Sequence, residues 1–177
     1  MTPVLPSTSV YSQDTDSLSA DQLYQAHHAH IFRFIWSRLH DVQQAEDLTG
    51  EVFYRMVSHL PGYRQRDIPF RAWLYRIARN LLIDHHRKER ITHAPIETAE
   101  KKAGEVSAEE RVETLLTLAR VQQALTTLEP QLREAVELRF LAGLSLEEVA
   151  LTMDKSVAAV KALQHRGLVA LRARLKE

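Results

Sequence analysis

The amino-acid sequence predicts an all-α protein, and three observations support this. Apolar residues recur at helical spacing through most of the chain from Leu23 to Leu175, and no segment shows the alternation typical of a strand. The 177 residues include only 5 glycines and 6 prolines, which disfavours a β-fold built on tight turns. Zero cysteines exclude a disulfide framework and a thiolate zinc site, and they favour a reducing compartment.

The first 18 residues are polar and rich in Ser and Thr, so we expect residues 1–18 to form a disordered tail. They contain no basic or apolar run typical of a signal peptide. No stretch of about 18 apolar residues occurs either, so we expect a cytoplasmic protein with no membrane insertion of its own.

Three helices are expected between residues 19 and 91, which we interpret as one small domain. The pattern is broken at Pro61-Gly62, and the third helix starts near Pro69 and reaches about Arg90. The predicted inward residues are Leu23, Ala26, His27, His30, Ile31 and Phe34 in the first helix, Val42, Ala45, Leu48, Val52, Phe53 and Met56 in the second, and Phe70, Trp73, Leu74, Ile77, Ala78 and Leu81 in the third.

A linker is expected over residues 92–111, where helical periodicity lapses and charged residues accompany Pro95 and Gly104. Residues 112–177 are expected to form a second helical domain. A capping box at Ser107-Ala-Glu-Glu110 announces its first helix, which should run to about Leu128.

The remaining elements of the second domain are marked by helix caps. Pro130 suits the first turn of a helix that Gly143 ends. A second capping box, Ser145-Leu-Glu-Glu148, opens a short helix through Met153. Ser156 can cap the last helix, which runs from Val157 to about Leu175.

The formal net charge is zero, but the charges are unevenly distributed along the chain. The segment from Gly62 to Arg90 contains eight basic and three acidic residues. The segment from Lys155 to Lys176 contains six basic residues and no acidic one. Acidic residues gather in the second helix, from Asp41 to Glu51. This asymmetry favours two basic surfaces and a separate acidic one over solvated helix faces alone.

The last two helices have the spacing of a helix-turn-helix, with a turn at Met153-Asp-Lys-Ser156. Small residues beside Lys161 and His165 would let the last helix approach base edges in a major groove, while Arg166 is placed for a phosphate. The predicted outer stripe of this helix consists of Ala158, Lys161, Ala162, His165, Val169 and Arg172.

The third helix carries a basic outward stripe and follows a loop that mixes aromatic and basic residues. Such a combination suits unpaired bases, which stack on rings while cations follow the backbone. For Tyr63 in this loop, base stacking and core packing are equally favoured, whereas Trp73 is expected in the core. The candidate residues are Tyr63, Arg64, Arg66, Arg76, Arg79, Asn80 and Arg87.

The second helix presents a polar face away from its apolar stripe, with Asp47, Gly50, Glu51 and Tyr54. An acidic face beside two basic ones is typical of a protein-binding surface, although a solvated face would have the same pattern.

Four strings resemble the extracytoplasmic-function (ECF, group IV) sigma factors of bacterial RNA polymerase. They lie in that family's order and spacing and cover nearly everything from Leu23 to Leu175. The strings are Ala45-Glu-Asp-Leu-Thr-Gly-Glu-Val-Phe53, Phe70-Arg-Ala-Trp-Leu-Tyr-Arg-Ile-Ala-Arg-Asn80, Gly143-Leu-Ser-Leu-Glu-Glu-Val-Ala150 and Val160-Lys-Ala-Leu-Gln-His-Arg166.

The resemblance implies a sigma domain two over residues 19–91 and a sigma domain four over residues 112–177. Domain two would bind the beta-prime clamp helices of core RNA polymerase through the Asp47 and Glu51 face. It would also open the minus-ten element and hold a flipped base near Tyr63. Domain four would bind the beta flap and read the minus-thirty-five element of promoter DNA. The residues that the resemblance assigns to that element are Arg139, Ser156, Ala158, Lys161, Ala162, His165 and Arg166. Among them, Arg139, Ser156 and Arg166 would contact phosphates. An anti-sigma factor is the further partner that it implies.

The chain departs from the family pattern at two positions. Gly50 stands where the family usually has Gln, which removes a side-chain contact and weakens the helix by about 1 kcal/mol relative to Ala. Asp154 stands where Gly is frequent in the helix-turn-helix turn, and Asp tolerates the left-handed conformation better than most residues.

A transcription regulator with a helix-turn-helix that acts without polymerase remains the main alternative. It explains the C-terminal half equally well, but it gives no reason for the arginine-aromatic loop of the N-terminal half. An enzyme is disfavoured, because the sequence has no Gly-rich phosphate loop, nucleophile elbow or HExxH motif. We expect no cofactor and no metal, since His27 and His30 lie on an apolar stripe and His28 points elsewhere.

Overall fold

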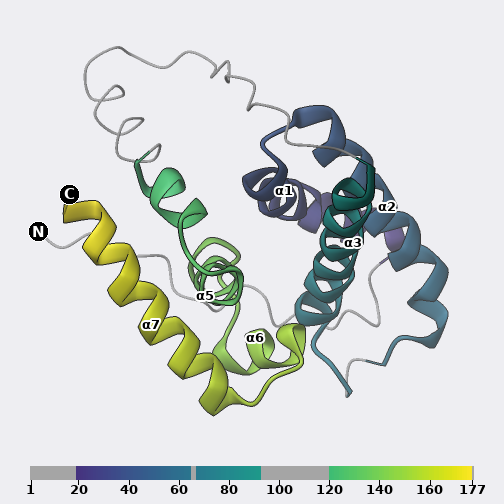
Figure 1. The fold of residues 1–177 in the computed structure, drawn as a ribbon. Helices are drawn as coiled ribbons and strands as arrows, with labels where there is room; N and C mark the ends of the chain where they lie inside the picture. Colours follow the sequence, from purple (N-terminus) through teal and green to yellow (C-terminus); the bar gives the residue numbers. More distant parts are fainter. Residues whose placement is uncertain (1–18, 65–66, 93–119, 177) are drawn as a thin grey trace, which may run out of the picture.

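The computed structural model describes residues 19–64, 67–92 and 120–176 (Figure 1). Within these ranges every regular element is a helix, which confirms the all-α prediction. The predicted tail, the linker after Thr92 and the capping box expected at Ser107 lie outside the described residues.

The N-terminal helical group consists of α1 (Ala20–Leu39), α2 (Val42–His59), the 3-10 turn η2 (Leu60–Gly62) and α3 (Phe70–Thr92). Its first two helices begin where side chains cap free backbone N–H groups. Ser19 Oγ accepts a bond from Gln22 N at 3.3 Å, and Asp41 Oδ1 accepts one from Gln44 N at 2.8 Å. Between these helices, His40 takes the left-handed conformation (φ 57°), so the chain reverses after only two residues.

The C-terminal helical group consists of a helical stretch at 120–126, α5 (Pro130–Val136), the π-helical turn η3 (Glu137–Leu141), α6 (Leu146–Met153) and α7 (Val157–Lys176). The predicted caps are confirmed: Ser145 and Glu148 form a reciprocal capping box, and Ser156 Oγ accepts a bond from Ala159 N at 3.1 Å. Asp154 adopts φ 56° and ψ 51°, so the turn before α7 forms without glycine, as expected.

Two residues predicted to face inward are exposed. Val42 is the first residue of α2 and is 56% exposed, because the first buried residue of that helix, Ala45, comes one turn later. Ala26 lies between the buried Leu23 and Ile31 of α1 but at the edge of the apolar stripe, where it stays in contact with solvent.

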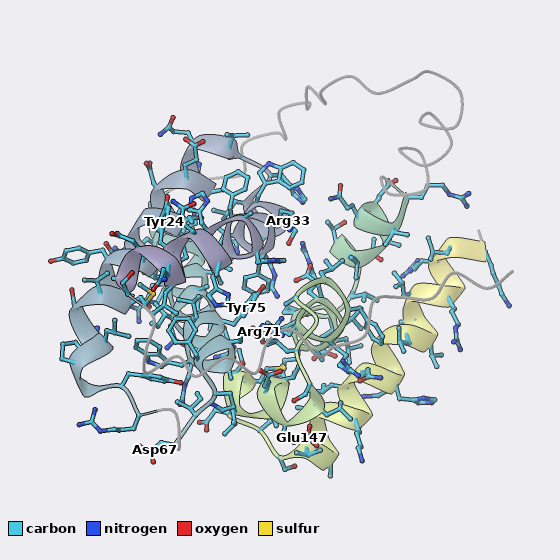
Figure 2. All side chains as sticks on the ribbon, turned by 180° about the vertical axis from the view of Figure 1, so that it is seen from behind. Tyr24, Arg33, Asp67, Arg71, Tyr75 and Glu147 are labelled. Carbon is cyan, nitrogen blue, oxygen red and sulfur yellow. The ribbon has the colours of Figure 1, made fainter. Side chains whose placement is uncertain are left out.

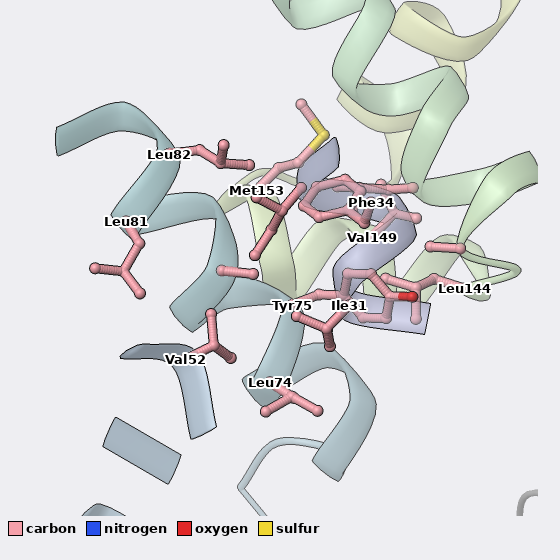
Figure 3. Packing of buried hydrophobic residues seen from close by; sticks show 14 of the residues in the cluster. Ile31, Phe34, Val52, Leu74, Tyr75, Leu81, Leu82, Leu144, Val149 and Met153 are labelled. Atoms are coloured by element: carbon pink, nitrogen blue, oxygen red, sulfur yellow. The ribbon is translucent and has the colours of Figure 1, made fainter. Parts of the chain in front are cut away.

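The two helical groups pack against each other and share one apolar core. Buried side chains from α1 and α3, such as Phe34 and Tyr75, belong to the same cluster as Leu144, Val149 and Met153 from the C-terminal group (Figure 3). In Figure 1, α6 lies beside one end of α3. The described parts of the chain therefore form one packed unit, whereas the division into two domains stays a prediction from the sequence.

The last helix approaches α5 so closely that one position requires glycine. A Cβ added at Gly167 would lie 2.7 Å from Val136 Cγ2 and 3.1 Å from the backbone oxygen of Leu132. Gly50, which is also helical, has nothing within 4 Å of an added Cβ. The two helical glycines therefore differ in packing although they have the same intrinsic cost in a helix.

Gly167→Ala and Gly50→Ala are expected to change stability in opposite directions. Gly50→Ala should raise the free energy of unfolding by about 1 kcal/mol, because alanine favours the helix and meets no neighbour. Gly167→Ala should lower it by about 1–3 kcal/mol, because overlap with α5 outweighs the gain in propensity. Urea unfolding followed by circular dichroism measures both, and equal stabilisation would contradict the close approach of α5 and α7.

Candidate nucleic-acid and polymerase interfaces

The outer stripe of α7 is exposed as the sequence predicts. Val160, Leu163 and Gly167 are buried against the rest of the C-terminal group, which turns the opposite side of the helix to solvent. All six predicted outer residues are exposed: Ala158, Lys161, Ala162, His165, Val169 and Arg172. The exposed side of α7 therefore has small residues around one lysine and one histidine. The major groove of B-form DNA is wide enough to admit such an α-helix.

Three further residues were expected to contact phosphates, and their surroundings differ. Arg166 is exposed on α7. The Ser156 hydroxyl is occupied in capping α7. Arg139 is half-buried, where its Nη1 donates to the Leu144 backbone oxygen at 2.8 Å and its guanidinium lies 5.9 Å from the Phe140 ring centroid. The phosphate roles of these residues stay predictions, and Arg139 would have to exchange an existing bond to perform one.

The basic stripe of α3 is divided between solvent and the C-terminal group. Arg76, Asn80 and Arg87 are exposed, and Arg87 Nη2 lies 3.5 Å from Asp84 Oδ1. Arg79, which the sequence places on the same stripe, instead donates from Nε to Glu134 Oε1 of α5 at 2.8 Å. Arg79 contacts the C-terminal group instead of solvent because of its position on the helix.

Arg79 stands four residues after Tyr75 and eight after Arg71, and side chains at this spacing follow one side of a helix. Tyr75 is buried in the shared core, so this side of α3 faces the C-terminal group. Arg71 follows the same direction, and Figure 2 shows it between the two groups. Its Nη2 donates to the Ala142 backbone oxygen at 2.6 Å.

Tyr63 is packed within an aromatic group rather than free in its loop. Its ring stacks on Trp73 with a centroid distance of 4.6 Å and meets the edge of Phe70 at 5.7 Å, and its hydroxyl donates to the Ile68 backbone oxygen at 2.8 Å. Arg64 is exposed and bonds backbone oxygens of the same loop. Arg66 lies outside the described residues.

The acidic face of α2 is exposed around Asp47, Gly50 and Tyr54, and Tyr54 is 70% exposed. Glu51 is half-buried and accepts a bond from Arg55 Nε at 2.7 Å. The predicted face therefore combines carboxylates with one large, solvent-facing ring, a composition suited to binding a basic partner surface.

Beside this face lies an open hollow of about 370 Å³ that the sequence reasoning missed. It is lined by Tyr24, His28 and Phe32 of α1 and by Glu46 and Gly50 of α2. The three rings recur every four residues along α1, and the missing side chain at Gly50 leaves the space in front of them open. The signal was present in the sequence, as an aromatic i, i+4, i+8 series beside a helical glycine.

The fold changes the ionisation of His27 strongly. Burial, the nearby Arg71 guanidinium and His30 together lower the pKa of His27 from 6.5 to about 4. Its ring lies 5.2 Å from that of Phe70, centroid to centroid. The neutral imidazole is thus part of the packing between α1 and the start of α3.

Comparison with known proteins identifies the family. Residues 23–91 match the family model of Sigma-70 region 2, and residues 118–171 match that of Sigma-70 region 4. The ECF RNA polymerase sigma factor SigD of Mycobacterium tuberculosis is 32% identical over 148 residues, which cover 80% of this chain and 70% of SigD. The chain belongs to the ECF sigma factors.

Other relatives place this sigma factor within the family. It is 39% identical over 150 residues to the ECF RNA polymerase sigma factor BldN of Streptomyces coelicolor, with 83% of this chain and 56% of BldN covered. The match therefore spans little more than half of that relative's length. SigL of Mycobacterium tuberculosis is 29% identical over 155 residues, which cover 88% of each chain.

Solved structures share the fold of this sigma factor. CnrH, solved in complex with the cytosolic domain of CnrY, aligns with a TM-score of 0.67 and 26% identity over 89% of this chain and 87% of CnrH. The sigma factor RpoE of Bartonella quintana, solved with the anti-sigma factor NepR, aligns with a TM-score of 0.73 and 22% identity over 88% and 96% of the two chains. Among the described helices of this sigma factor, none is long and apolar enough to span a membrane.

The lowered pKa of His27 predicts a loss of stability in acid. Below pH 6.5 the unfolded chain binds a proton at this position that the folded chain does not bind until about pH 4. Stability should therefore fall as the pH drops from about 6.5 to about 4 and then level off with respect to this group. Because the ring is only partly buried, the loss should amount to about 1–2 kcal/mol.

The measurement is the free energy of urea unfolding at pH 7 and pH 4.5 for the wild-type protein and His27→Gln. The wild-type protein should lose about 1–2 kcal/mol more than the variant between these two pH values. An identical loss in both proteins would show that other groups cause the acid sensitivity.

Proposed function

We propose that this sigma factor recruits core RNA polymerase to promoters with distinct minus-ten and minus-thirty-five elements and initiates transcription there. The observation that carries the proposal is that regions two and four of the family occur in order, at 23–91 and 118–171, on helices with separate basic faces. It would act by binding, without catalytic residues or a cofactor of its own, and in the cytoplasm, where polymerase transcribes.

The exposed stripe of α7 would read the minus-thirty-five element in the major groove. Lys161 can donate to a guanine O6 or N7, His165 can bond a base edge, and Ala158 and Ala162 leave room for close approach. Arg166 would position the helix through a phosphate, with Ser156 and Arg139 at the flanking backbone. The exposure of all the α7 residues supports these roles.

The minus-ten element would be bound by α3 and the preceding loop. Arg76, Asn80 and Arg87 form the exposed part of the stripe, and Arg64 extends the cationic surface toward the loop. The stacked pair of Tyr63 and Trp73 provides an aromatic wall beside which an unpaired base can stack. Arg66 and Arg79 complete the proposed set. This arrangement supports capture of a flipped base as the source of DNA opening.

Core polymerase would bind the acidic face of α2 through its beta-prime clamp helices and the C-terminal group through the beta flap. Asp47, Glu51 and Tyr54 supply charge and apolar area, while Gly50 leaves the neighbouring hollow accessible. An anti-sigma factor is a further proposed partner. CnrH, which is 26% identical, was solved in complex with the cytosolic domain of CnrY, and this supports a protein partner for this chain as well.

Run-off transcription with core polymerase tests the proposed function. Templates should carry candidate promoters from the genome of origin, and scrambled versions of the two elements serve as controls. We expect a product of defined length only when the sigma factor and an intact promoter are both present. If the purified protein binds core polymerase in gel filtration but yields no promoter-dependent product on any template, the proposal is wrong.

Lys161→Ala and Arg166→Ala distinguish base reading from phosphate contact. Lys161→Ala should reduce transcription from the best minus-thirty-five sequence by about tenfold and reduce discrimination against substituted sequences, because one base contact contributes about 1–3 kcal/mol. Arg166→Ala should weaken binding to all promoter sequences about equally. It should also reduce the slope of log affinity against log salt concentration by about one, as expected for the loss of one phosphate contact. A uniform loss for Lys161→Ala would place that residue on the DNA backbone.

A further inference from the structure

The interface between the two helical groups contains buried carboxylates that meet arginines of the opposite group. Glu137 of η3 is fully buried and pairs with Arg38 of α1, while Glu134 of α5 is 7% exposed and pairs with Arg79 of α3 at 2.8 Å. We call Arg38–Glu137 and Arg79–Glu134 the inter-group ion pairs. A buried carboxylate is costly unless a cation is held against it, so both pairs depend on contact between the groups.

Backbone contacts accompany the inter-group ion pairs. Arg133 bonds Glu137 within its own helix at 2.7 Å and also donates to the Ser37 backbone oxygen of α1 at 2.7 Å. In the opposite direction, Arg71 of α3 donates to the Ala142 backbone oxygen at 2.6 Å, at the start of the helix-turn-helix. Three arginines thus cross the interface from the N-terminal side and one from the C-terminal side, which fixes both groups in one relative position.

We call the arrangement in which the two helical groups are packed together the closed structure. In it, one residue of the proposed minus-ten surface is already bonded to the other group. Arg79 belongs to the basic stripe of α3, but in the closed structure its Nε is bonded to Glu134 and its side chain is 22% exposed. A carboxylate held against an arginine resembles the phosphate oxygen that this arginine would bind on DNA. Glu134 therefore competes directly with promoter DNA for Arg79.

The closed form is also too small to contact both promoter elements together. Positions ten and thirty-five lie about 25 base pairs apart, about 85 Å along B-form DNA at 3.4 Å per base pair. A compact body of about 130 residues, the size of the described ranges, has a radius of gyration of about 14 Å and measures about 40 Å across. The stripe of α7 and the stripe of α3 can reach their elements simultaneously only after the two groups separate.

We propose that α5 and η3 act as an internal inhibitor, in which Glu134 and Glu137 hold the free sigma factor closed and occupy Arg79 until polymerase separates the two groups. This inference rests on the proposed function, because closure is inhibitory only if the protein acts as a sigma factor. The closed state itself can be measured without promoter or polymerase. The inhibitor is part of the folded chain, so it acts in addition to any anti-sigma factor.

The interface is built so that it can open. Arg38 Nη2 is buried and has no hydrogen-bond partner among the described residues, so closing leaves one donor unsatisfied. Buried ion pairs lose most of their Coulomb attraction to the cost of removing both charges from water, so separation returns that solvation. Closure therefore needs the shared apolar core as well, and a partner that binds both groups can displace it.

The absence of cysteine allows two spin labels to be placed without further changes. Gln25→Cys on α1 and Ala173→Cys on α7 are exposed and lie outside every proposed binding residue. Double electron–electron resonance on the labelled full-length protein should give one narrow distance distribution in the free state. A broad distribution extending to long distances in the free wild-type protein would overturn the proposal.

Glu134→Gln tests the cause of closure, with Glu129→Gln as the matched control. Both remove one negative charge, Glu134→Gln from within α5 and Glu129→Gln from its N-cap position, but Glu129 is exposed and makes no side-chain cap. Glu134→Gln should decrease the ratio of closed to open molecules by about tenfold, because Arg79 is left without its partner. Glu129→Gln should leave the distribution unchanged. Equal distributions in both variants would overturn the role of Glu134.

A charge exchange separates this effect from loss of folding. Arg79→Glu alone and Glu134→Arg alone should open the protein, and the double variant should restore the narrow distribution, while circular dichroism checks that all three remain helical. Opening that persists in the double variant would overturn a specific pair between these residues.

Adding core polymerase completes the test. The distance should lengthen on binding, and Glu134→Gln should bind polymerase several-fold more tightly than the wild-type protein and Glu129→Gln. A closed free protein that yields no promoter-dependent transcript would contradict the proposed function alone. A productive sigma factor that is already open when free would contradict the inhibitor alone.

Discussion

The structure depends on how the buried carboxylates of the C-terminal group are compensated. Glu137 is fully enclosed, and its two oxygens are bonded by Arg38 from one side and Arg133 from the other. Without Arg38 a charge would remain in an apolar core with only half of its bonds made, so the position of α1 against η3 follows from this one side chain.

Much of the fold was predictable because its determinants are local. The roles of the helix caps and the turn could be predicted from sequence spacing alone, because each involves partners no more than four residues apart. This holds for Ser145 with Glu148, for Ser156 and for Asp154. The α7 stripe was predictable for the same reason, since the burial of Val160 and Leu163 determines which side faces out. Local periodicity does not reveal the edges of a face, which explains the exposed Ala26 and Val42.

The relation between the two groups could not be predicted from such patterns. Glu134 is 55 residues from Arg79, and Glu137 is 99 residues from Arg38. On a helical wheel, a glutamate beside apolar residues is expected at the solvent-exposed edge of the apolar face. The local sequence does not indicate that an arginine from another helix will cover it. The same limit applies to Arg79, which shares the basic stripe of α3 in sequence but is turned by its register toward the C-terminal group.

The zero net charge of the chain acquires a physical meaning from this arrangement. A sum over the sequence hides the basic stripes, but it also hides where the compensating acids lie. Some of them lie on α2, apart from the stripes, whereas Glu134 is in direct contact with one stripe arginine. Because Arg79 is already paired with Glu134, it offers no free charge to a phosphate, and nonspecific binding to DNA loses the counterion release of that one contact. When the groups separate, Arg79 becomes available without any change in total charge, so its contribution to DNA affinity depends on conformation rather than on composition.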